Sequence, residues 1–458
     1  MSATVAECAP RLEALARKLG LDYHPVDFEL VPTTFMMEVA VYGLPVRMPH
    51  WSFGVRYIHQ LIRRSMGHSR IFEVMFPGDP CHAYLVSTNT LAENTLVIAH
   101  VLGHADFAKN NQLFARFEQM AGTHIVEHAA AQAHRIEEAV TEFGQQRVEA
   151  VLDAALALEP HVDTNTELHR PPYPARPQTA DAIPAVDPFR ERYKGLPGEK
   201  AAPETSKEHR PAPVPPNPEY DLLWFIAHYA PELQDWERDV FLAVREESFY
   251  FYPVFACQIM NEGWATYWHA RLLREADFLP ENVYLDAIKA HSDVVRPFAA
   301  EQQTALAVNP YHLGFSMWEN IVEQQGIEKA RQIRRDEDDF GFIRNYLDRE
   351  LAEKLGLFVF EAREDGEIRV AARDIDAVRE AILAPRFNYG VPRICVSELR
   401  HDGTLVLIHD HQSDGRGLDL ERATRVLEYV QRVWRRPVIL HTTDTHGAAH
   451  ELTARKNG

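Results

Sequence analysis

The sequence predicts a mainly α-helical protein that is interrupted by a Pro-rich segment and followed by a small C-terminal α/β domain. Three observations lead to this prediction. Apolar residues recur at helical spacing on both sides of the interruption, prolines gather between Pro160 and Pro218, and short apolar runs typical of strands gather near the C-terminus. The 458 residues are enough for two or three domains with a large buried core.

We expect four segments along the chain. They are the N-terminal part of a helical core (1–159), a Pro-rich linker or extended arm (160–219), the C-terminal part of the core (220–364) and a small α/β domain (365–458). Helical periodicity is clear over 90–158 and resumes at Asp221. Further helices are predicted around 281–306, 319–334 and 340–355.

The Pro-rich segment holds 14 of the 29 prolines within 59 residues. Proline lacks a backbone N–H and favours extended conformations, so this segment is not expected to form regular helices or strands. Two interpretations remain open, a disordered linker and an arm that lies across a folded surface.

The C-terminal segment changes character. The runs GEIRVAA, RICVSEL and TLVLIHDH predict strands, and the dipeptide Asp402-Gly403 predicts a turn between the last two. An amphipathic helix is expected over Leu420–Trp434, with an apolar stripe formed by Leu420, Ala423, Leu427, Val430 and Trp434. The run RPVILHTT then predicts a closing strand.

The chain carries 48 Lys and Arg against 67 Asp and Glu, for a formal net charge of −19. Binding to nucleic acid or to an anionic membrane needs clustered basic side chains, so neither is an expected partner. No apolar run is long enough to span a bilayer, and the N-terminus lacks the pattern of a signal peptide. The four cysteines lie far apart and indicate neither a disulfide framework nor a cysteine-based zinc site. We therefore expect a cytoplasmic protein.

The segment AHVLGHADFAKNN is the first candidate for chemistry. His100 and His104 are four residues apart, so on a helix both imidazoles project from one face, as in the HExxH zinc helix. Val101 stands where that motif has glutamate, so the usual general base is missing. Histidines at this spacing also occur by chance and as polar core residues.

The second candidate is MNEGWATYWH, where Glu262 and His269 are seven residues apart and share a helix face. The bulky apolar neighbours predict a buried helix. A carboxylate there must be bound to a metal, protonated, or paired with a group such as Arg or Tyr. The metal and non-metal interpretations both remain open.

A two-metal arrangement is a further alternative, because Glu93 precedes His100 by the same seven residues. Bundles with two bridged metals typically use Glu-x-x-His, which these helices lack. His409 and His411 share a face of a predicted strand, where solvated side chains are commoner than metal ligands. No phosphate-loop, dinucleotide or nucleophile-elbow motif occurs.

Six blocks together resemble the SpoVR family, the stage V sporulation protein R-like proteins. They are MPHWSFG (48–54), AHVLGHADFAKNN (99–111), DLLWFI (221–226), REESFYFYP (245–253), MNEGWATYWH (260–269) and NPYHLGF (309–315). The resemblance implies a role in formation of the spore cortex peptidoglycan or, in bacteria that do not sporulate, in a stress response. It also implies a PrkA-type serine kinase and a von Willebrand A-like protein as partners.

The helix with Glu-Gly-Trp-Ala beside a two-histidine helix is also similar to the paired helices of gluzincin metallopeptidases. This resemblance implies His100, His104 and Glu262 as ligands of a divalent metal, with zinc the leading candidate. His269 would be a fourth ligand or would orient the substrate.

The implied reaction is amide hydrolysis by metal-activated water. Glu247, or else Glu246, would replace the missing base. Three asparagines would either contact the substrate at the rim of the pocket or simply cap helices, namely Asn110, Asn111 and Asn261. Two rivals remain, a non-catalytic regulatory protein that acts with the kinase and an oxidative two-metal protein.

Overall fold

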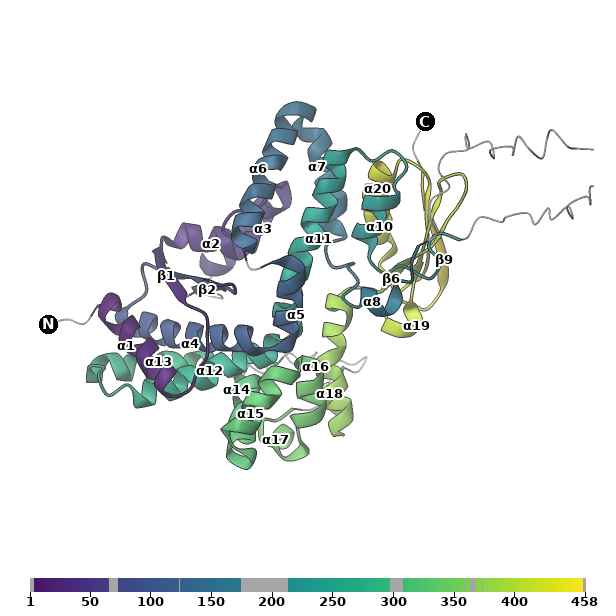
Figure 1. Cartoon of the computed structure of the whole chain (residues 1–458). Helices are drawn as coiled ribbons and strands as arrows, with labels where there is room; N and C mark the ends of the chain where they lie inside the picture. The colour runs from purple at the N-terminus through teal and green to yellow at the C-terminus, as the bar shows by residue number, and fades with distance from the viewer. Residues whose placement is uncertain are drawn as a thin grey trace, which may run out of the picture.

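The computed structural model describes residues 4–65, 73–122, 124–173, 213–296, 308–357, 359–362, 368–372 and 374–455. Most of these residues are helical, and a four-stranded sheet lies near the C-terminus (Figure 1). The predicted fold class, mainly α with a small C-terminal α/β domain, is confirmed. Most of the predicted Pro-rich arm, residues 174–212, lies outside the described residues.

The helices fall on both sides of the Pro-rich segment. Before it are α1 (Val5–Lys18), α2 (Thr33–Tyr42), α3 (Trp51–Ser65), α4 (Leu91–Asn110), α5 (Gln112–Ala121), α6 (Ile125–Phe143), α7 (Gln145–Ala157) and the short α8 (Thr166–His169). After it are α10 (Leu222–Tyr229), α11 (Asp235–Ala256), α12 (Gln258–Glu275), α13 (Glu281–Val294), α14 (Pro310–Gln325), α15 (Ile327–Asp336), α16 (Asp339–Tyr346), α17 (Arg349–Lys354) and α18 (Ile375–Leu383). The predicted helix over 319–334 is divided at Gly326, whose φ of +83° ends α14.

Helix α12 packs between α4 and α14, although these three helices come from opposite sides of the Pro-rich segment (Figure 1). Glycines bring their backbones together. A Cβ on Gly103 of α4 would lie 2.6 Å from Cα of Ala265, and one on Gly263 would lie 2.3 Å from the carbonyl carbon of Gly314. Real Cβ atoms do not approach other atoms so closely, so these contacts require glycine.

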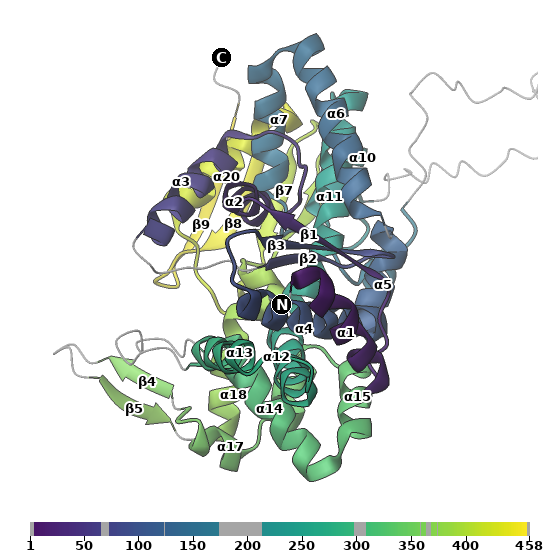
Figure 2. The same cartoon turned by 90° about the vertical axis from the view of Figure 1, so that its left-hand side faces the viewer.

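A small mixed sheet, which the sequence patterns did not predict, covers one side of α4 (Figure 2). Its strands are β1 (Val26–Val31), β2 (Glu73–Phe76) and β3 (Cys81–Val86). The central strand β3 is parallel to β1 and antiparallel to β2. Glu73 therefore lies at the start of an edge strand close to α4.

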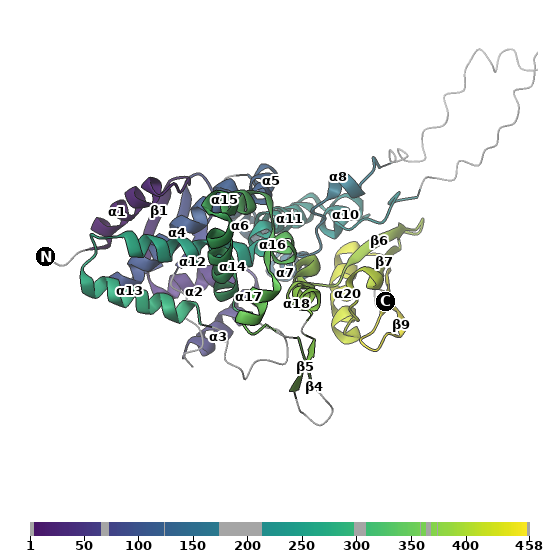
Figure 3. The same cartoon turned by 90° about the horizontal axis from the view of Figure 1, so that it is seen from below.

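The C-terminal unit is a four-stranded sheet with the order β6-β7-β8-β9. Its elements are β6 (Ile394–Leu399), β7 (Leu405–His409), the short α19 (His411–Asp414), α20 (Leu420–Trp434), β8 (Val438–Thr443) and β9 (Ala449–Ala454). Strands β7 and β8 are parallel and are joined through α20, whereas β6 and β9 pair antiparallel to their neighbours. Of the predicted apolar stripe of α20, Leu427, Val430 and Trp434 are buried, whereas Leu420 and Ala423 are half-buried. The helix, seen beside the sheet in Figure 3, packs on α7.

Along the chain, α17 is followed by a hairpin of β4 (Val359–Ala362) and β5 (Ile368–Ala372). It projects from the body of the protein (Figure 2). The predicted strand GEIRVAA corresponds to β5. Helix α18 follows, and its buried residues Val378, Ile382 and Leu383 belong to the same apolar core as α4 and α12.

The two described flanks of the Pro-rich segment are held together. The guanidinium of Arg170 donates two hydrogen bonds to Glu219, at 2.7 and 3.0 Å, and the hydroxyl of Tyr173 donates a third at 2.8 Å. Glu219 also forms a β-bridge with Val396 of β6. Both flanks are thereby fixed beside the C-terminal sheet.

Within the described ranges, no helix is both long enough and apolar enough to cross a membrane.

We predict that Gly314→Ala lowers the free energy of unfolding by about 1–3 kcal/mol, because overpacking a tight contact has costs of this order. The new Cβ would lie 2.2 Å from the carbonyl oxygen of Ile259. Urea denaturation measures the effect. The matched control is Gly54→Ala on α3, where no atom lies within 4 Å and stability should stay or rise slightly. Equal effects of the two substitutions would contradict the role given to close helix packing.

Candidate metal centre

Helix α4 is buried on almost every side, and this burial shapes the site. A capping box begins the helix: the hydroxyl of Thr90 accepts a hydrogen bond from the N–H of Glu93, whose carboxylate accepts one from the N–H of Thr90. Glu93 therefore caps α4 two turns before His100. Among the buried residues that follow, His100 is 2% exposed and Val101 is fully buried in the apolar core.

Helix α12 is fixed at its start by a side chain from another helix. Both carboxylate oxygens of Asp339 accept hydrogen bonds at 2.9 Å, from the backbone N–H groups of Ile259 and Met260. A carboxylate at a helix N-terminus satisfies unpaired donors and is favoured by the helix dipole. Glu262 follows within the next turn, so its position depends on this cap.

A second contact fixes α12 against α4. The indole N–H of Trp264 donates to the buried carboxylate of Asp106 at 2.8 Å, and the guanidinium of Arg334 pairs with the same carboxylate. Asp106 lies two residues after His104. The two helices are therefore held in register where their polar side chains face each other.

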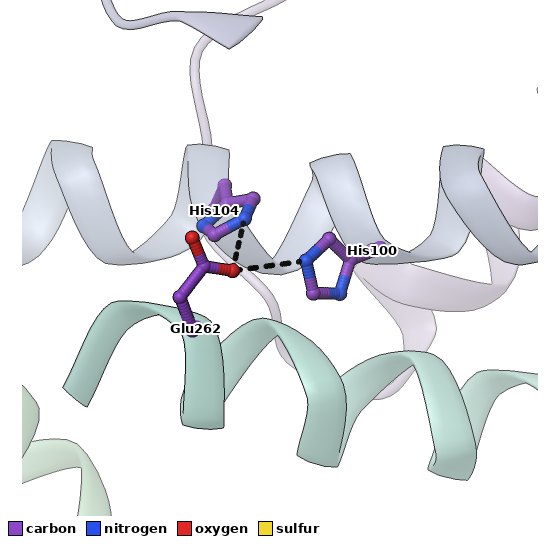
Figure 4. Close-up of side chains that lie close together, drawn as sticks. All are labelled: His100, His104 and Glu262. Carbon is purple, nitrogen blue, oxygen red and sulfur yellow. Dashed lines mark ion pairs between the residues drawn. The ribbon is translucent and has the colours of Figure 1, made fainter. Parts of the chain in front are cut away.

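Three of the predicted ligands come together between these helices (Figure 4). The Nε2 atoms of His100 and His104 each lie 3.5 Å from the same carboxylate oxygen, Oε2 of Glu262. The two histidines project from successive turns of α4, and Glu262 projects from α12 toward them. The spacing read from the sequence thus corresponds to one cluster in the structure.

The opposite nitrogen of His104 is hydrogen-bonded in a way that sets the ring orientation. Nδ1 of His104 donates to the amide oxygen of Asn261 at 2.8 Å. An amide oxygen can only accept, so Nδ1 carries the proton, and in the neutral ring Nε2 has a free lone pair. Asn261 was predicted to contact substrate; its described hydrogen bond is to this imidazole.

His100 is oriented similarly by His269. Their Nδ1 atoms lie 2.9 Å apart, within hydrogen-bonding distance. This bond occupies Nδ1 of His100 and leaves its Nε2 facing Glu262. His269 thus contacts the side of His100 away from Glu262, and its own Nε2 lies 2.6 Å from Nδ1 of His291. Such outer partners fix the ring and tautomer of metal-binding histidines.

Two further side chains at the cluster were not identified from the sequence. Glu73, on the edge strand β2, interacts electrostatically with Glu262 and His104. Tyr311, in the first turn of α14, interacts electrostatically with Glu262, and its ring stacks on His100 with centroids 5.9 Å apart. Tyr311 belongs to the block NPYHLGF, which was a usable signal, whereas no motif marks Glu73.

Burial and charge separate the protonation states of these groups. Burial lowers the pKa of His100 to about 4, so its ring is neutral near pH 7. Burial also opposes ionisation of His104 and Glu262, but their mutual attraction outweighs it, raising the pKa of His104 and lowering that of Glu262. Burial, and then the charge of Glu262, raise the pKa of Glu73 to about 7.

The residues present fit a zinc ion. His100 Nε2 and Glu262 Oε2 are buried and have no hydrogen-bond partner among the described residues. Leaving such atoms unpaired is costly, which is explained if a cation binds them. Two imidazoles and a carboxylate are a common zinc donor set, and ligands about 2.0–2.1 Å from a tetrahedral zinc lie roughly 3.3 Å from each other. The observed 3.5 Å separations are close to that value.

Comparison with known proteins shows to which family the chain belongs. The family described as "SpoVR like protein" matches residues 2–389, and the one described as "SpoVR-like C-terminal domain" matches 392–445. The chain belongs to the SpoVR family. It is 27% identical over 483 aligned residues to "Uncharacterized protein YcgB" of Escherichia coli strain K12, with 96% of this chain and 92% of the relative covered. No solved structure matches the chain.

The other predicted substrate contacts of this SpoVR chain have hydrogen bonds within the fold. Asn110 donates to the carbonyl oxygens of Asp22 and Asp106. The side chain of Asn111 caps α5, accepting from the N–H groups of Leu113 and Phe114. These bonds give both asparagines a role in shaping the end of α4.

The two glutamates predicted as bases lie on α11 and interact with other groups. Oε2 of Glu247 is 2.6 Å from Nε of Arg47, and both side chains are buried. Oε1 of Glu246 is 3.1 Å from Nδ1 of His128. The structure thus places neither residue in the cluster of His100, His104 and Glu262.

A second group with metal-ligand chemistry lies in the SpoVR C-terminal domain, formed by His409, His411 and Asp414. Here the ring nitrogens of His409 are already hydrogen-bonded, to Asp414 at 2.9 Å and to Thr442 at 3.0 Å. Asp414 also accepts from the backbone N–H groups of Arg393 and Arg416. A metal ion would have to break these bonds, unlike at the first cluster.

We predict that Arg47→Met lowers the free energy of unfolding by about 3–5 kcal/mol, because it leaves the buried carboxylate of Glu247 without a counter-ion. Chemical denaturation followed by circular dichroism measures the change. The control is Arg425→Met on the exposed face of α20, whose pair with Glu421 should contribute less than about 1 kcal/mol. If Arg47→Met lowers the free energy of unfolding by less than about 1 kcal/mol, the ion pair with Arg47 does not stabilise the buried carboxylate of Glu247.

Proposed function

We propose that the chain is a metal-dependent hydrolase that cleaves an amide bond, with zinc bound by His100, His104 and Glu262. The observation that carries the proposal is the convergence of two imidazole nitrogens on one carboxylate oxygen, each at 3.5 Å, in a buried site. When bound, zinc supplies Lewis-acid chemistry, since it lowers the pKa of water and polarises a carbonyl group. Asn261 and His269 hold the two imidazoles in the orientation that this binding requires.

Glu73 is the side chain best suited to accept the proton that hydrolysis releases from water. It interacts electrostatically with Glu262 and His104, and burial raises the pKa of its carboxyl group, which favours uptake of a proton. In this proposal Glu73, from strand β2, performs the role of the glutamate that Val101 replaces. Glu246 and Glu247, which form ion pairs on α11, are less suited to it.

Tyr311 is suited to stabilise negative charge on the oxygen of the cleaved carbonyl. The charge of Glu262 and then burial raise the pKa of this phenol well above its usual value, so the hydroxyl stays protonated and can donate. Donors fixed beside a developing oxyanion are a large source of rate enhancement.

Membership of the SpoVR family guides the choice of substrate and location. The family resemblance supports amide bonds of peptidoglycan precursors as substrates, in spore cortex formation or in a stress response. A regulatory protein is the other substrate class. The four cysteines are free and buried, which supports the reducing cytoplasm as the location.

A second function is favoured by one observation. Val101, at the position of the usual glutamate, is completely buried, so α4 itself offers no base. A non-catalytic regulatory or scaffold protein would keep the metal to hold α4 and α12 together. The Pro-rich segment and the C-terminal domain would then contact a PrkA-type serine kinase and its von Willebrand A-like companion.

Metal analysis tests the shared part of both functions. We expect about one zinc ion per chain in protein purified without a histidine tag, and loss of that zinc in His104→Ala and in Glu262→Gln, because three protein ligands are needed. The matched control is His134→Ala on α6, an imidazole that is 71% exposed and should leave the metal content unchanged. Zinc retained in both site variants would contradict the ligand assignment. Stoichiometric iron in place of zinc in the unaltered chain would favour the oxidative two-metal protein.

Turnover of peptide and muropeptide amides separates hydrolase from scaffold. We expect Glu73→Gln to lower kcat by about 10²–10⁴-fold, the usual contribution of a general base, while zinc content stays unchanged. Glu246→Gln is the control and should retain full activity. Hydrolysis that is unchanged in Glu73→Gln would exclude the proposed base, and a zinc-loaded protein without any turnover would favour the regulatory function.

A further inference from the structure

A cavity of about 380 Å³ lies where the helical core, the flanks of the Pro-rich segment and the C-terminal sheet meet. Its walls come from the loop after α7, the end of α11, the start of α16, the irregular turn η2 (Ala384–Gly390) and the start of β6. Its volume is within the range of about 300–1,000 Å³ that is typical of small-molecule sites. The lining does not include His100, His104 or Glu262, so this is a different site from the metal centre.

Three arginines, Arg344, Arg386 and Arg393, line this cavity in a chain whose net charge is −19. The guanidinium of Arg393 lies 4.2 Å from the centre of the Tyr220 ring, and its ion pair with Asp410 is long, at 3.8 Å. Its donors therefore retain capacity for a stronger partner. Two carboxylates, Asp163 and Asp339, also line the cavity, so the three guanidinium groups leave an excess of positive charge there, which favours an anionic ligand.

Aromatic side chains form much of the remaining wall, and each is half-buried. They are Tyr252, Phe255, Phe340, Phe387 and Tyr389. The rings of Phe255 and Tyr389 stack at 25° with centroids 5.4 Å apart, and Tyr252 meets Tyr389 edge-on at 4.9 Å. Flat faces of this kind favour a ligand that carries a planar ring.

The turn η2 contributes both shape and polar groups. Asn388 and Tyr389 have φ values of +51° and +56°, a left-handed conformation that costs energy for residues other than glycine. Thr164 and Asn165 face the same cavity from the loop after α7. Hydroxyl and amide groups can both donate and accept hydrogen bonds, as the edge of a nucleobase requires.

We propose that this cavity binds a nucleoside monophosphate, with the phosphate at Arg393 and Arg386 and the base against the aromatic wall. A guanidinium fork matches two phosphate oxygens, and the aromatic faces and amides match a base and its edge. The volume suits one nucleotide rather than a dinucleotide. The proposal is independent of the hydrolase proposal, because it uses none of its residues.

The choice of test variant follows from the contacts of the arginines. Arg386 donates to Asp339 at 3.1 Å, and Asp339 caps α12, so replacing Arg386 would also disturb the metal centre. Arg393 has no such link: its described side-chain contacts are with Asp410 and Tyr220. Arg393→Gln therefore removes a proposed phosphate ligand with the least effect on the fold.

The experiment is isothermal titration calorimetry of the full chain with AMP, GMP, CMP and UMP, and with ribose 5-phosphate as the probe without a base. We expect at least one of the four nucleotides to bind the full chain at a single site with a Kd in the micromolar range. The same nucleotide should bind to Arg393→Gln at least about tenfold more weakly. Ribose 5-phosphate should bind at least about fivefold more weakly than that nucleotide, because stacking on the aromatic wall is lost.

The matched control is Arg400→Gln, an exposed arginine at the end of β6 outside the cavity, which should bind like the unaltered chain. Should Arg393→Gln fail to fold, Arg393→Lys replaces it, because lysine keeps the positive charge beside Asp410 but lacks the guanidinium fork for two phosphate oxygens. Three results would each overturn the proposal. They are binding of none of the four nucleotides at 1 mM or below, equal binding of ribose 5-phosphate, and equal binding to the arginine variant of the cavity.

Discussion

The close approach of three helices is the constraint on which the rest of the structure depends. Gly103 lets the backbone of α4 touch that of α12, and Gly263 and Gly314 do the same for α12 and α14. The polar side chains of the metal centre come from these three helices, with Glu73 added from the neighbouring strand. A side chain on any of these glycines would separate the helices and move the imidazoles away from Glu262. The packing of these helices in the core therefore determines the geometry of the site.

Burial gives the site its chemical character. An imidazole and a carboxylate that are withdrawn from water keep their charges only if they face each other or a cation. His104 and Glu262 have this mutual dependence, whereas the ring of His100 is neutral. The unpaired atoms His100 Nε2 and Glu262 Oε2 are costly in a protein without a cation. A divalent ion would remove that cost, which supports the proposed metal site over a hydrogen-bonded core network.

Helical periodicity placed two of the three central side chains, because His100 and His104 share a helix face by their spacing. Glu262 was joined to them only through the resemblance to the paired helices of gluzincin metallopeptidases, and from that resemblance their meeting could be foreseen. Glu73 could not, because a strand of four residues with mixed burial has no recognisable period. The ion-pair partner of Glu247 could not be predicted either, because Arg47 is 200 positions away in the chain. The breaks between helices could not be predicted from the periodicity either, because a single glycine such as Gly326 ends a helix without changing the apolar pattern.

X-ray absorption spectroscopy of the zinc-loaded full chain tests the central claim most directly, because it reports the atoms bound to the ion. The account predicts a first shell of nitrogen and oxygen near 2.0–2.1 Å, with the multiple-scattering signal of two imidazoles and without sulfur. In Glu262→Gln the same zinc environment should be lost. A sulfur shell near 2.3 Å, or an unchanged spectrum in Glu262→Gln, would contradict the assignment of His100, His104 and Glu262 as the metal ligands.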